Sequence, residues 1–435
     1  MLATASQPLV RIVDRYLPDA YIFVLILTII VFAAAILVEG QAPLDVATMW
    51  GDGFWALLTF SMQMLLILVT GFMLAMTPPV KWLLRTIATF ATSPGSAIVV
   101  VSLVSLAASW INWGFGLVVG ALFAKEVARL IRVDYRLLVA SAYSGFVVWH
   151  GGLAGSVPLA VATPGHPFEG ITGIIPTGET IFSFFNLAIV AALFLVVPLV
   201  NWLMVPDSKD SVYVERHQLA EPELEIPRPE RPAEWLEYSP ILSWIVGAAG
   251  LVWIVTYFAG GGGLTLNTVI FTFLILAIIL HGSPRRTLIA LQEAVTGGAG
   301  IVIQFPFYAG IMAIMVNSGL AESISTWMVG FASDVTLPFW IFLSAGLVNF
   351  FVPSGGGQWA VQAPIILPAA EALGVDFARA SMAVAWGDAW TNLIQPFWAL
   401  PMLAIAGLKA KDIMGFCLMH LLITGAIIAV CLTFL

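Results

Sequence analysis

Glycines and polar side chains interrupt the long apolar stretches of this 435-residue sequence, and these interruptions are where chemistry can occur. The clearest interruption reads NFFVPSGGGQW and covers residues 349–359. Hydrocarbon holds no water to satisfy a broken backbone, so such a break persists only where it is buried in protein or faces a watery cavity. Close helix packing does not explain a proline followed by four small residues, so we interpret this segment as a binding site.

The residues at the breaks are suited to binding an anion together with a cation. Glycines allow backbone carbonyls to turn inward, where the amide oxygens of Asn112 and Asn349 could join them as Na⁺ ligands. A helix that restarts near Gln358 would direct its positive N-terminal end toward a carboxylate. No Lys or Arg lies near these breaks, so an anion must be held by helix ends, amides, hydroxyls and a co-bound cation. For the isolated Gly114, close packing is the simpler interpretation.

Asp388 and His150 are the titratable residues within the breaks. A carboxylate is costly inside apolar sequence, so we interpret Asp388 as functional, against the alternative of a neutral acid hydrogen-bonded for structure. If Asp388 titrates as the protein works, the cation bound with the anion is a proton, and if it stays ionised, it could help to hold Na⁺. His150 is open to a coupling role or to a plain hydrogen-bonded role. The other histidines, including His420, are expected in loops or at helix ends.

The composition is that of a polytopic membrane protein. Hydrophobic residues make up 60% and charged residues 10% of the chain, and the mean hydropathy is +0.99, whereas soluble domains carry about 25% charged residues. Much of the net charge of −8 falls in an acidic, proline-rich linker over residues 207–237, and nothing indicates a nucleic-acid partner. Cys417 and Cys431 lie in one apolar run, which excludes a disulfide framework and a cysteine metal site.

The distribution of charge predicts how the apolar segments are oriented. Bases precede the first apolar run, follow the second, and recur from Lys125 to Arg136, whereas residues 39–53 and 164–180 contain acids and neither Lys nor Arg. The positive-inside rule therefore places the N-terminus in the cytoplasm. The apolar segment 96–124 must then begin and end on the cytoplasmic side, which predicts a re-entrant hairpin. Residues 338–370 are predicted to form a second hairpin of opposite orientation.

The two halves of the chain resemble one another. Four pairs of residues recur at nearly constant spacing, namely Gln63 with Gln304, Asn112 with Asn349, Gly145 with Gly387, and Trp149 with Trp390. An unpaired helix at 240–258 inverts the second half, and inverted repeats with interrupted helices are typical of secondary transporters. The predicted fold is an all-α polytopic membrane protein of two inverted repeats, with re-entrant hairpins, interrupted helices and about nine spanning helices. The predicted parts are a cytoplasmic N-terminal segment (1–19), a first transport repeat (20–204), the acidic Pro-rich cytoplasmic linker with a connecting helix (205–265), and a second, inverted transport repeat (266–435).

Several motifs resemble those of the bacterial short-chain fatty acid transporter family, whose members are associated with acetoacetate and butyrate uptake. The motifs are WGDGFWALLTFSMQM, INWGFGLVVGA, VPSGGGQW, QPFWALPMLAIAGL and KDIMG, and the resemblance runs from about Arg11 to the end of the chain. That family is placed in the ion-transporter superfamily, whose dicarboxylate carriers pair two hairpin tips with two broken helices and move an anion with Na⁺. Those carriers usually show Ser-Asn-Thr at the tips, whereas the tips here keep Asn112 and Asn349 without that triplet.

The resemblance implies a secondary active transporter that imports short-chain fatty acids with a coupled cation, Na⁺ or H⁺, by alternating access. The expected location is the bacterial inner membrane, with many crossings and a cytoplasmic N-terminus, and a homodimer is expected because related carriers often dimerise. Two alternatives remain, a passive channel for small carboxylates and an integral-membrane enzyme acting on a lipid or acyl substrate. No P-loop, paired metal-ligand motif or nucleophile elbow is present, which disfavours an enzyme.

The candidate residues fall into two sets, and no catalytic residue and no cofactor other than a coupling Na⁺ is predicted. The tryptophans are interpreted as an apolar wall for a short acyl chain or as interfacial belts. The predicted substrate-binding residues are Ser354, Gly355, Gly356, Gly357, Gln358, Trp113, Gly114, Trp149, Trp390, Thr391, Asn392 and Gln395. The predicted cation-coupling residues are Asn112, Gly116, Asn349, Asp388 and His150, with Asn112 and Asn349 nearest to a predicted Na⁺.

Overall fold

The computed structural model describes residues 20–206, 209, 211–215, 219, 230–349, 352–395 and 398–435. Within these residues the regular secondary structure is helical, with no strand, which confirms the predicted all-α class. Seven helical segments of this part are long and apolar enough to cross a membrane, and α2, α14 and α18 are shorter apolar helices. The predicted segment 1–19 and most of the acidic linker lie outside the described residues.

The helices of the first half begin with a span, an amphipathic helix and a second span, and then form a hairpin and an interrupted helix. They are α2 (Ala20–Leu37), α3 (Pro43–Gly53), α4 (Leu58–Ala75), α5 (Pro78–Ala88), α6 (Pro94–Ile111), α7 (Trp113–Leu130), α8 (Tyr135–Ser144), the 3₁₀ helix η1 (Gly145–Gly151), α9 (Ser156–Val161), α10 (Glu169–Thr172) and α11 (Phe184–Leu203).

The second half follows a short helix and a connecting span. These are α12 (Pro232–Tyr238) and α13 (Pro240–Ala259), and then α14 (Leu266–His281), α15 (Pro284–Thr296), α16 (Ala299–Asn317), α17 (Leu320–Val329), α18 (Leu337–Val348), α19 (Gly355–Leu373), α20 (Phe377–Thr391), α21 (Ala399–Ala406) and α22 (Ala410–Phe434).

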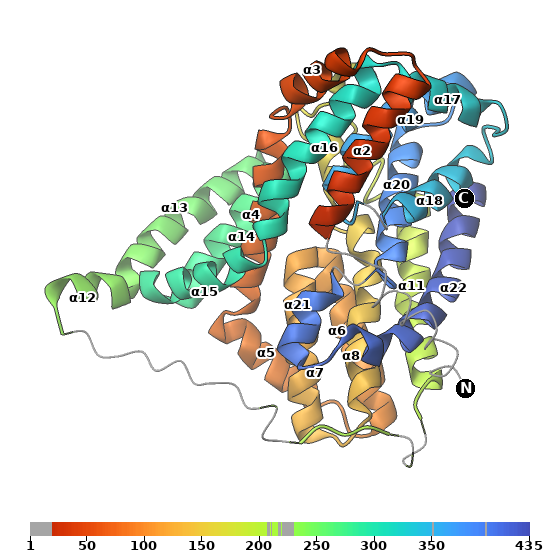
Figure 1. Cartoon of the computed structure of the whole chain (residues 1–435). Helices are drawn as coiled ribbons and strands as arrows, with labels where there is room; N and C mark the ends of the chain where they lie inside the picture. Colours follow the sequence, from red (N-terminus) through yellow and green to blue (C-terminus); the bar gives the residue numbers. More distant parts are fainter. Residues whose placement is uncertain are drawn as a thin grey trace.

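The contacts between helices follow an internal twofold symmetry. Helix α2 packs on α16 as α14 packs on α4, and α6 packs on α8 and α11 as α18 packs on α20 and α22. The second part of each interrupted helix packs on the hairpin of the opposite half, α21 on α7 and α9 on α19. Figure 1 shows the α6–α7 hairpin in the lower part of the view and the α18–α19 hairpin in the upper part. The two halves are therefore inverted and interlocked.

The first hairpin is closed by glycines that bring its two arms together. A Cβ on Gly116 would lie 2.5 Å from the Ser109 Cα, and one on Gly120 would lie 3.0 Å from the Ser105 hydroxyl. Asn112 alone separates α6 from α7, with an extended backbone. In the second hairpin the arms are joined by a bond from Gln358 Nε2 to the Ala345 carbonyl at 2.8 Å. Its tip is longer, because α18 ends at Val348 and α19 begins only at Gly355.

Capping residues explain where the helices around the hairpins begin and end. Side chains of Asn112, Asp134 and Asp376 accept hydrogen bonds from backbone N–H groups at the starts of α7, α8 and α20, which satisfies donors that the helix itself leaves free. Gly374 and Gly407 adopt φ near +70° where α19 and α21 end. That left-handed conformation suits glycine because it has no Cβ.

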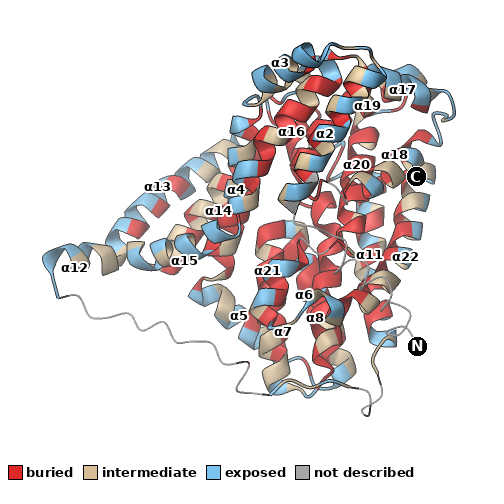
Figure 2. Cartoon of the chain, in the orientation of Figure 1, coloured by how far each residue is buried: buried red, intermediate tan, exposed pale blue. Residues whose placement is uncertain are grey.

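Burial separates a transport core from a lipid-facing periphery. In the apolar 18-residue stretch of the interrupted helix α8–η1–α9, 94% of the residues are buried, whereas in that of α13 the share is 17%. Figure 2 shows buried residues concentrated in the α6–α8 and α19–α20 region, with α12 and α13 largely exposed at one side. Exposed apolar side chains such as Trp244, Ile245 and Val252 on α13 suit contact with lipid. The residues that could carry transport therefore lie where the two halves interlock.

Candidate functional site

The candidate site forms where the two interrupted helices meet the start of α19. His150 lies in η1, and Asp388 lies in the last turns of α20. Gly355 begins α19, and a Cβ added there would lie 2.5 Å from His150 Cε1 and 2.8 Å from Trp149 Cη2. Helix α20 packs on both η1 and α19, and α9 also packs on both. These contacts bring η1, the end of α20 and the start of α19 together. All four of these residues are buried.

A hydrogen-bonded pair joins the two halves at the centre of this site. His150 Nδ1 lies 3.0 Å from Asp388 Oδ2, and both side chains are fully buried. The Val157 N–H donates to His150 Nε2 at 3.1 Å, which assigns the proton of a neutral ring to Nδ1. His150 then donates to the carboxyl group of Asp388. Within the described residues, Asp388 Oδ1 has no hydrogen-bond partner, so an ionised Asp388 would leave one buried oxygen unpaired.

Asn349 links the tip of the second hairpin to the same helix turn. Its Nδ2 donates to the Asp388 carbonyl at 3.1 Å and to Thr391 Oγ1 at 2.9 Å. In the part of the chain that the structure describes, the amide oxygens Asn349 Oδ1 and Gln358 Oε1 are buried without a partner. Buried polar atoms are normally paired, so each unpaired oxygen needs an explanation. Together with Asp388 Oδ1 they are oxygen acceptors suited to a proton or a hard cation.

The start of α19 offers donors for an anion. Ser354 is its N-cap and is half-buried, and its side chain makes no capping hydrogen bond among the described residues. The first backbone N–H groups of a helix have no partner within the helix, and here they belong to Gly355, Gly356 and Gly357. The side-chain amide of Gln358 is not available to an anion, because its Nε2 donates to the Ala345 carbonyl and to Gln362 Oε1. Gln358 therefore fastens the hairpin, with only its oxygen left over.

Aromatic rings wall the site on the side of the first half. The Trp149 ring stacks on His150 with centroids 4.0 Å apart, and Trp113 approaches Trp149 at 5.9 Å. Trp149 Nε1 donates to Asn392 Oδ1 at 3.0 Å. Trp390 instead donates to the Leu421 carbonyl and packs on Gly346 and Gly425. The structure therefore places Trp149 beside His150, with Trp113 packed on Trp149, and turns Trp390 toward α22.

Several predicted glycines are closely packed by side chains. A Cβ on Gly114 would meet the Leu68 backbone, one on Gly356 would meet Phe60, and one on Gly357 would meet Tyr308. Gly116 packs against Ser109, as described above. These positions require glycine for close approach of helices, and among the predicted glycines Gly355 is the one that faces His150.

The structure sets Asn112 in a different role from Asn349. Asn112 Oδ1 accepts a bond from the Phe115 N–H at 2.9 Å and so caps α7. Asn349, by contrast, donates to the Asp388 carbonyl. Of the other predicted residues, Thr391 donates to the Gly387 carbonyl, and Gln395 is buried just beyond the end of α20. The His150–Asp388 pair departs from the internal symmetry, because the two residues are not at equivalent positions of the repeats.

Other buried polar residues support the site and were missed from the sequence. Asn186 donates to the Gly151 carbonyl and accepts from Trp386 Nε1, and Tyr143 donates to the Asn392 carbonyl at 2.6 Å. An asparagine in the apolar run FFNLAIV was a signal that could have found Asn186.

The expectation for His420 is wrong. This residue is buried within α22 and its Nε2 lies 2.7 Å from Asn201 Oδ1. Asn201 Nδ2 also donates to Ser102 and Ser144, so the cluster joins α6, α8, α11 and α22. The error arose because a single histidine in an apolar run carries no local sign of the asparagine that pairs with it. Among the residues that the structure describes, no three His, Cys, Asp or Glu side chains gather as a metal site.

Comparison with known proteins identifies related sequences along the whole chain. Residues 1–435 match the family described as "Short chain fatty acid transporter". A protein of Escherichia coli (strain K12), named as a proposed short-chain fatty acid transporter, is 47% identical over 438 residues and covers 100% of both chains. A protein of Haemophilus influenzae (strain ATCC 51907 / DSM 11121 / KW20 / Rd) with the same name is 43% identical over 447 residues, again covering 100% of both.

A solved structure shares the fold. The crystal structure of the YdaH transporter from Alcanivorax borkumensis, described as having an unusual topology, aligns with a TM-score of 0.57 and 15% identity. The alignment covers 95% of this chain and 98% of that chain. This likeness extends over nearly the whole molecule and concerns the arrangement of the helices.

Proposed function

Because this chain belongs to the short-chain fatty acid transporter family, we propose that it is a secondary active transporter that imports small monocarboxylates such as butyrate and acetoacetate. Transport proceeds by alternating access, with one cation coupled to each carboxylate. The observation that carries the proposal is the buried His150–Asp388 pair beside the N-terminus of α19, where the Ser354 side chain makes no capping hydrogen bond among the described residues. The pair provides a site for a proton. Gly355, which lies against His150, begins the row of backbone N–H groups that could bind an anion.

The substrate carboxylate is placed at the start of α19. The Ser354 hydroxyl and the N–H groups of Gly355 to Gly357 provide donors without a positively charged side chain. The Trp149 ring stacks on His150 and approaches Gly355, Trp113 packs on Trp149, and these two rings would contact the short acyl chain. Asn392 and Thr391 hold Trp149 and Asn349 in place around this volume.

The coupled ion is proposed to be a proton carried by Asp388. A fully buried carboxylate with one unpaired oxygen is unfavourable, and protonation removes its charge. When Asp388 is ionised, Asp388 and the bound substrate carboxylate together carry two negative charges. When Asp388 is protonated, the bound substrate carboxylate is the only negative charge of the pair. This arrangement favours the loaded site for movement through a low-dielectric barrier.

Na⁺ is the second candidate for the coupled ion. The unpaired oxygens of Asn349, Gln358 and Asp388 among the described residues favour it, because hard cations prefer oxygen ligands. Asn112 is a weaker candidate ligand because its oxygen already caps α7.

The proposed setting is the bacterial inner membrane, with the N-terminus in the cytoplasm as the charge distribution indicates. A homodimer is proposed on the family resemblance. Alternating access is supported by the interlocked inverted halves, since inverted repeats with interrupted helices are typical of carriers that open to each side in turn.

Counterflow distinguishes this carrier from a channel and from an enzyme. Proteoliposomes preloaded with unlabelled butyrate are diluted into a trace of labelled butyrate at alkaline pH, where nearly all of the acid is ionised. The expected result is a transient accumulation of label above its equilibrium level, because each outward turnover of a carrier returns with labelled substrate. Protein-free liposomes give the baseline for passage of the neutral acid.

The same experiment identifies the rival functions. A monotonic approach to equilibrium, faster than in protein-free liposomes, would identify a passive channel. Recovery of the label in a new chemical product would identify an enzyme. Either result contradicts the proposed carrier.

A further inference from the structure

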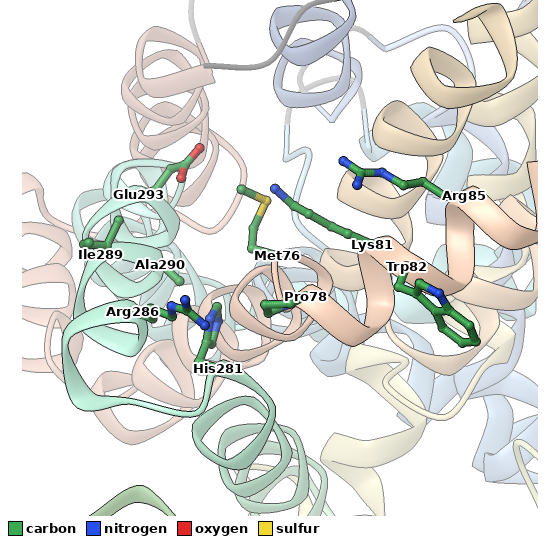
Figure 3. A pocket seen from close by; sticks show the side chains of 10 residues that line it. All are labelled: Met76, Pro78, Lys81, Trp82, Arg85, His281, Arg286, Ile289, Ala290 and Glu293. Atoms are coloured by element: carbon green, nitrogen blue, oxygen red, sulfur yellow. The ribbon is translucent and has the colours of Figure 1, made fainter. Parts of the chain in front are cut away.

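A basic pocket lies outside the transport site, between the amphipathic helices α5 and α15. Its volume is about 370 Å³, and it is lined by Met76, Pro78, Lys81, Trp82, Arg85, His281, Arg286, Ile289, Ala290 and Glu293. Figure 3 shows Lys81 and Arg85 extending from α5 toward the side where Arg286 and Glu293 lie. Three permanent bases and one acid line the pocket, which favours an anionic ligand. None of these residues belongs to the site around His150.

The pocket lies at the level where the hydrocarbon-spanning helices end. Helix α4 ends at Ala75 and α14 at His281, and both ends adjoin the pocket through Met76 and His281. His281 is fixed there by a bond between its Nε2 and the Met73 carbonyl at 2.8 Å. Lipid headgroups occupy this level of a bilayer. Bases at this level attract anionic lipids.

Apolar surface next to the bases indicates that the anion carries acyl chains. Trp82 is 67% exposed, and Leu83 on α5 and Leu288 on α15 are also exposed. A separate groove lies farther along α4 and α14, where its lining includes Met62, Leu66, Ile270 and Leu274. Leu66 precedes Met76 by ten residues, about 15 Å of helix, which an acyl chain extending from the pocket could span. A free inorganic anion would use the bases and leave these apolar surfaces uncovered.

From the charge of the pocket, the exposed apolar side chains beside it and the groove farther along the same helices, we infer that this pocket binds the phosphate headgroup of an anionic phospholipid, with an acyl chain extending toward the α4–α14 groove. Lys81 on α5 and Arg286 on α15 line the pocket from its two sides and are the bases chosen for substitution, and Arg85 also pairs with Glu126 at 3.4 Å. The headgroup would bridge α5 of the first half and α15 of the second half. A lipid bound there would hold the two amphipathic helices at a fixed separation.

Native mass spectrometry of the detergent-solubilised full chain tests this inference. The chain is titrated with dioleoyl phosphatidylglycerol, dioleoyl phosphatidylcholine and inorganic phosphate in separate arms. Phosphatidylglycerol is expected to bind more tightly than phosphatidylcholine. The double variant Lys81→Gln, Arg286→Gln is expected to weaken phosphatidylglycerol binding about 30-fold, the effect of two bases.

Two further variants separate loss of the pocket from loss of folding or of general charge. Lys409→Gln with Lys411→Gln removes two exposed bases that do not line the pocket, and is expected to leave binding unchanged. Glu293→Gln removes the acid of the pocket and is expected to strengthen binding several-fold, which a misfolded chain cannot do.

Three results would overturn the inference. The first is equal binding of phosphatidylglycerol and phosphatidylcholine by the unmodified chain. The second is undiminished binding in the Lys81→Gln, Arg286→Gln variant. The third is displacement of phosphatidylglycerol by millimolar inorganic phosphate, which would make the pocket a site for free phosphate and remove the lipid as its occupant.

Discussion

The Asp388→Asn variant is expected to take up butyrate at a rate that no longer depends on the external pH. In the unmodified protein the initial rate should rise as the external pH falls, by up to about tenfold per pH unit, the limit for one bound proton. Asparagine is nearly isosteric, and its side-chain oxygen can still accept the bond from His150 Nδ1. It cannot take up a proton, so only the coupling is removed.

The measurement is the initial rate of labelled butyrate uptake into proteoliposomes over a series of external pH values, corrected for protein-free liposomes. Asp376→Asn is the matched control, because Asp376 caps the same helix by accepting from the Arg379 N–H and asparagine caps helices equally well. An Asp388→Asn variant with the pH dependence of the unmodified protein would exclude Asp388 as the proton carrier.

Ser354→Ala and Gly355→Ala are expected to weaken butyrate binding most strongly. Ser354→Ala removes a donor to a charged ligand, a loss of about 1.5–3 kcal/mol, which corresponds to about 10- to 100-fold in the dissociation constant. Gly355→Ala would set a Cβ 2.5 Å from His150 Cε1. Either the His150 ring or the start of α19 must move. The backbone N–H donors proposed for the carboxylate are then displaced relative to the His150–Asp388 pair.

Calorimetric titration of the solubilised variants with butyrate measures the loss, and thermal unfolding reports whether they remain folded. Ser344→Ala and Gly178→Ala are the matched controls. The Ser344 hydroxyl bonds back to the Ile341 carbonyl in its own helix, and a Cβ on Gly178 would meet open space. Binding by Ser354→Ala and Gly355→Ala that equals the controls would exclude the start of α19 as the carboxylate site.

Much of the fold could be predicted because membrane crossings leave local signals in a sequence. Apolar runs identify helices such as α4 and α11 one at a time, and the recurrence of Asn112 at Asn349 reveals the repeat. The hairpins follow from the orientation that charges impose. Short helices such as α5 and α15 carry weaker signals, because their amphipathic sequences are short and lie beside apolar runs.

The pairing within the site depends on packing between distant segments and could not be predicted. His150 and Asp388 were each visible as polar residues in apolar surroundings, yet nothing local shows that one bonds to the other across 238 positions. The repeat also misleads where the halves differ. Trp149 and Trp390 are matched in the sequence, but Trp149 stacks on His150 while Trp390 bonds to α22.

Close packing and capping further distinguish residues that look alike in the sequence. Asn112 and Asn349 both follow the first arm of a hairpin, but a one-residue turn makes Asn112 a helix cap. The longer second tip leaves Asn349 free to reach Asp388 and Thr391. The length of a turn thus decides whether an asparagine supports a helix or faces the site.

The most direct test of the account is uptake of labelled butyrate and acetoacetate into proteoliposomes with a pH gradient and a Na⁺ gradient imposed separately. Initial rates are corrected for protein-free liposomes, because the neutral acids cross bilayers unaided. An acidic exterior is expected to accelerate uptake, whereas an inward Na⁺ gradient at equal pH on both sides is not. Uptake driven by Na⁺ alone, or by neither gradient, would contradict proton coupling through Asp388.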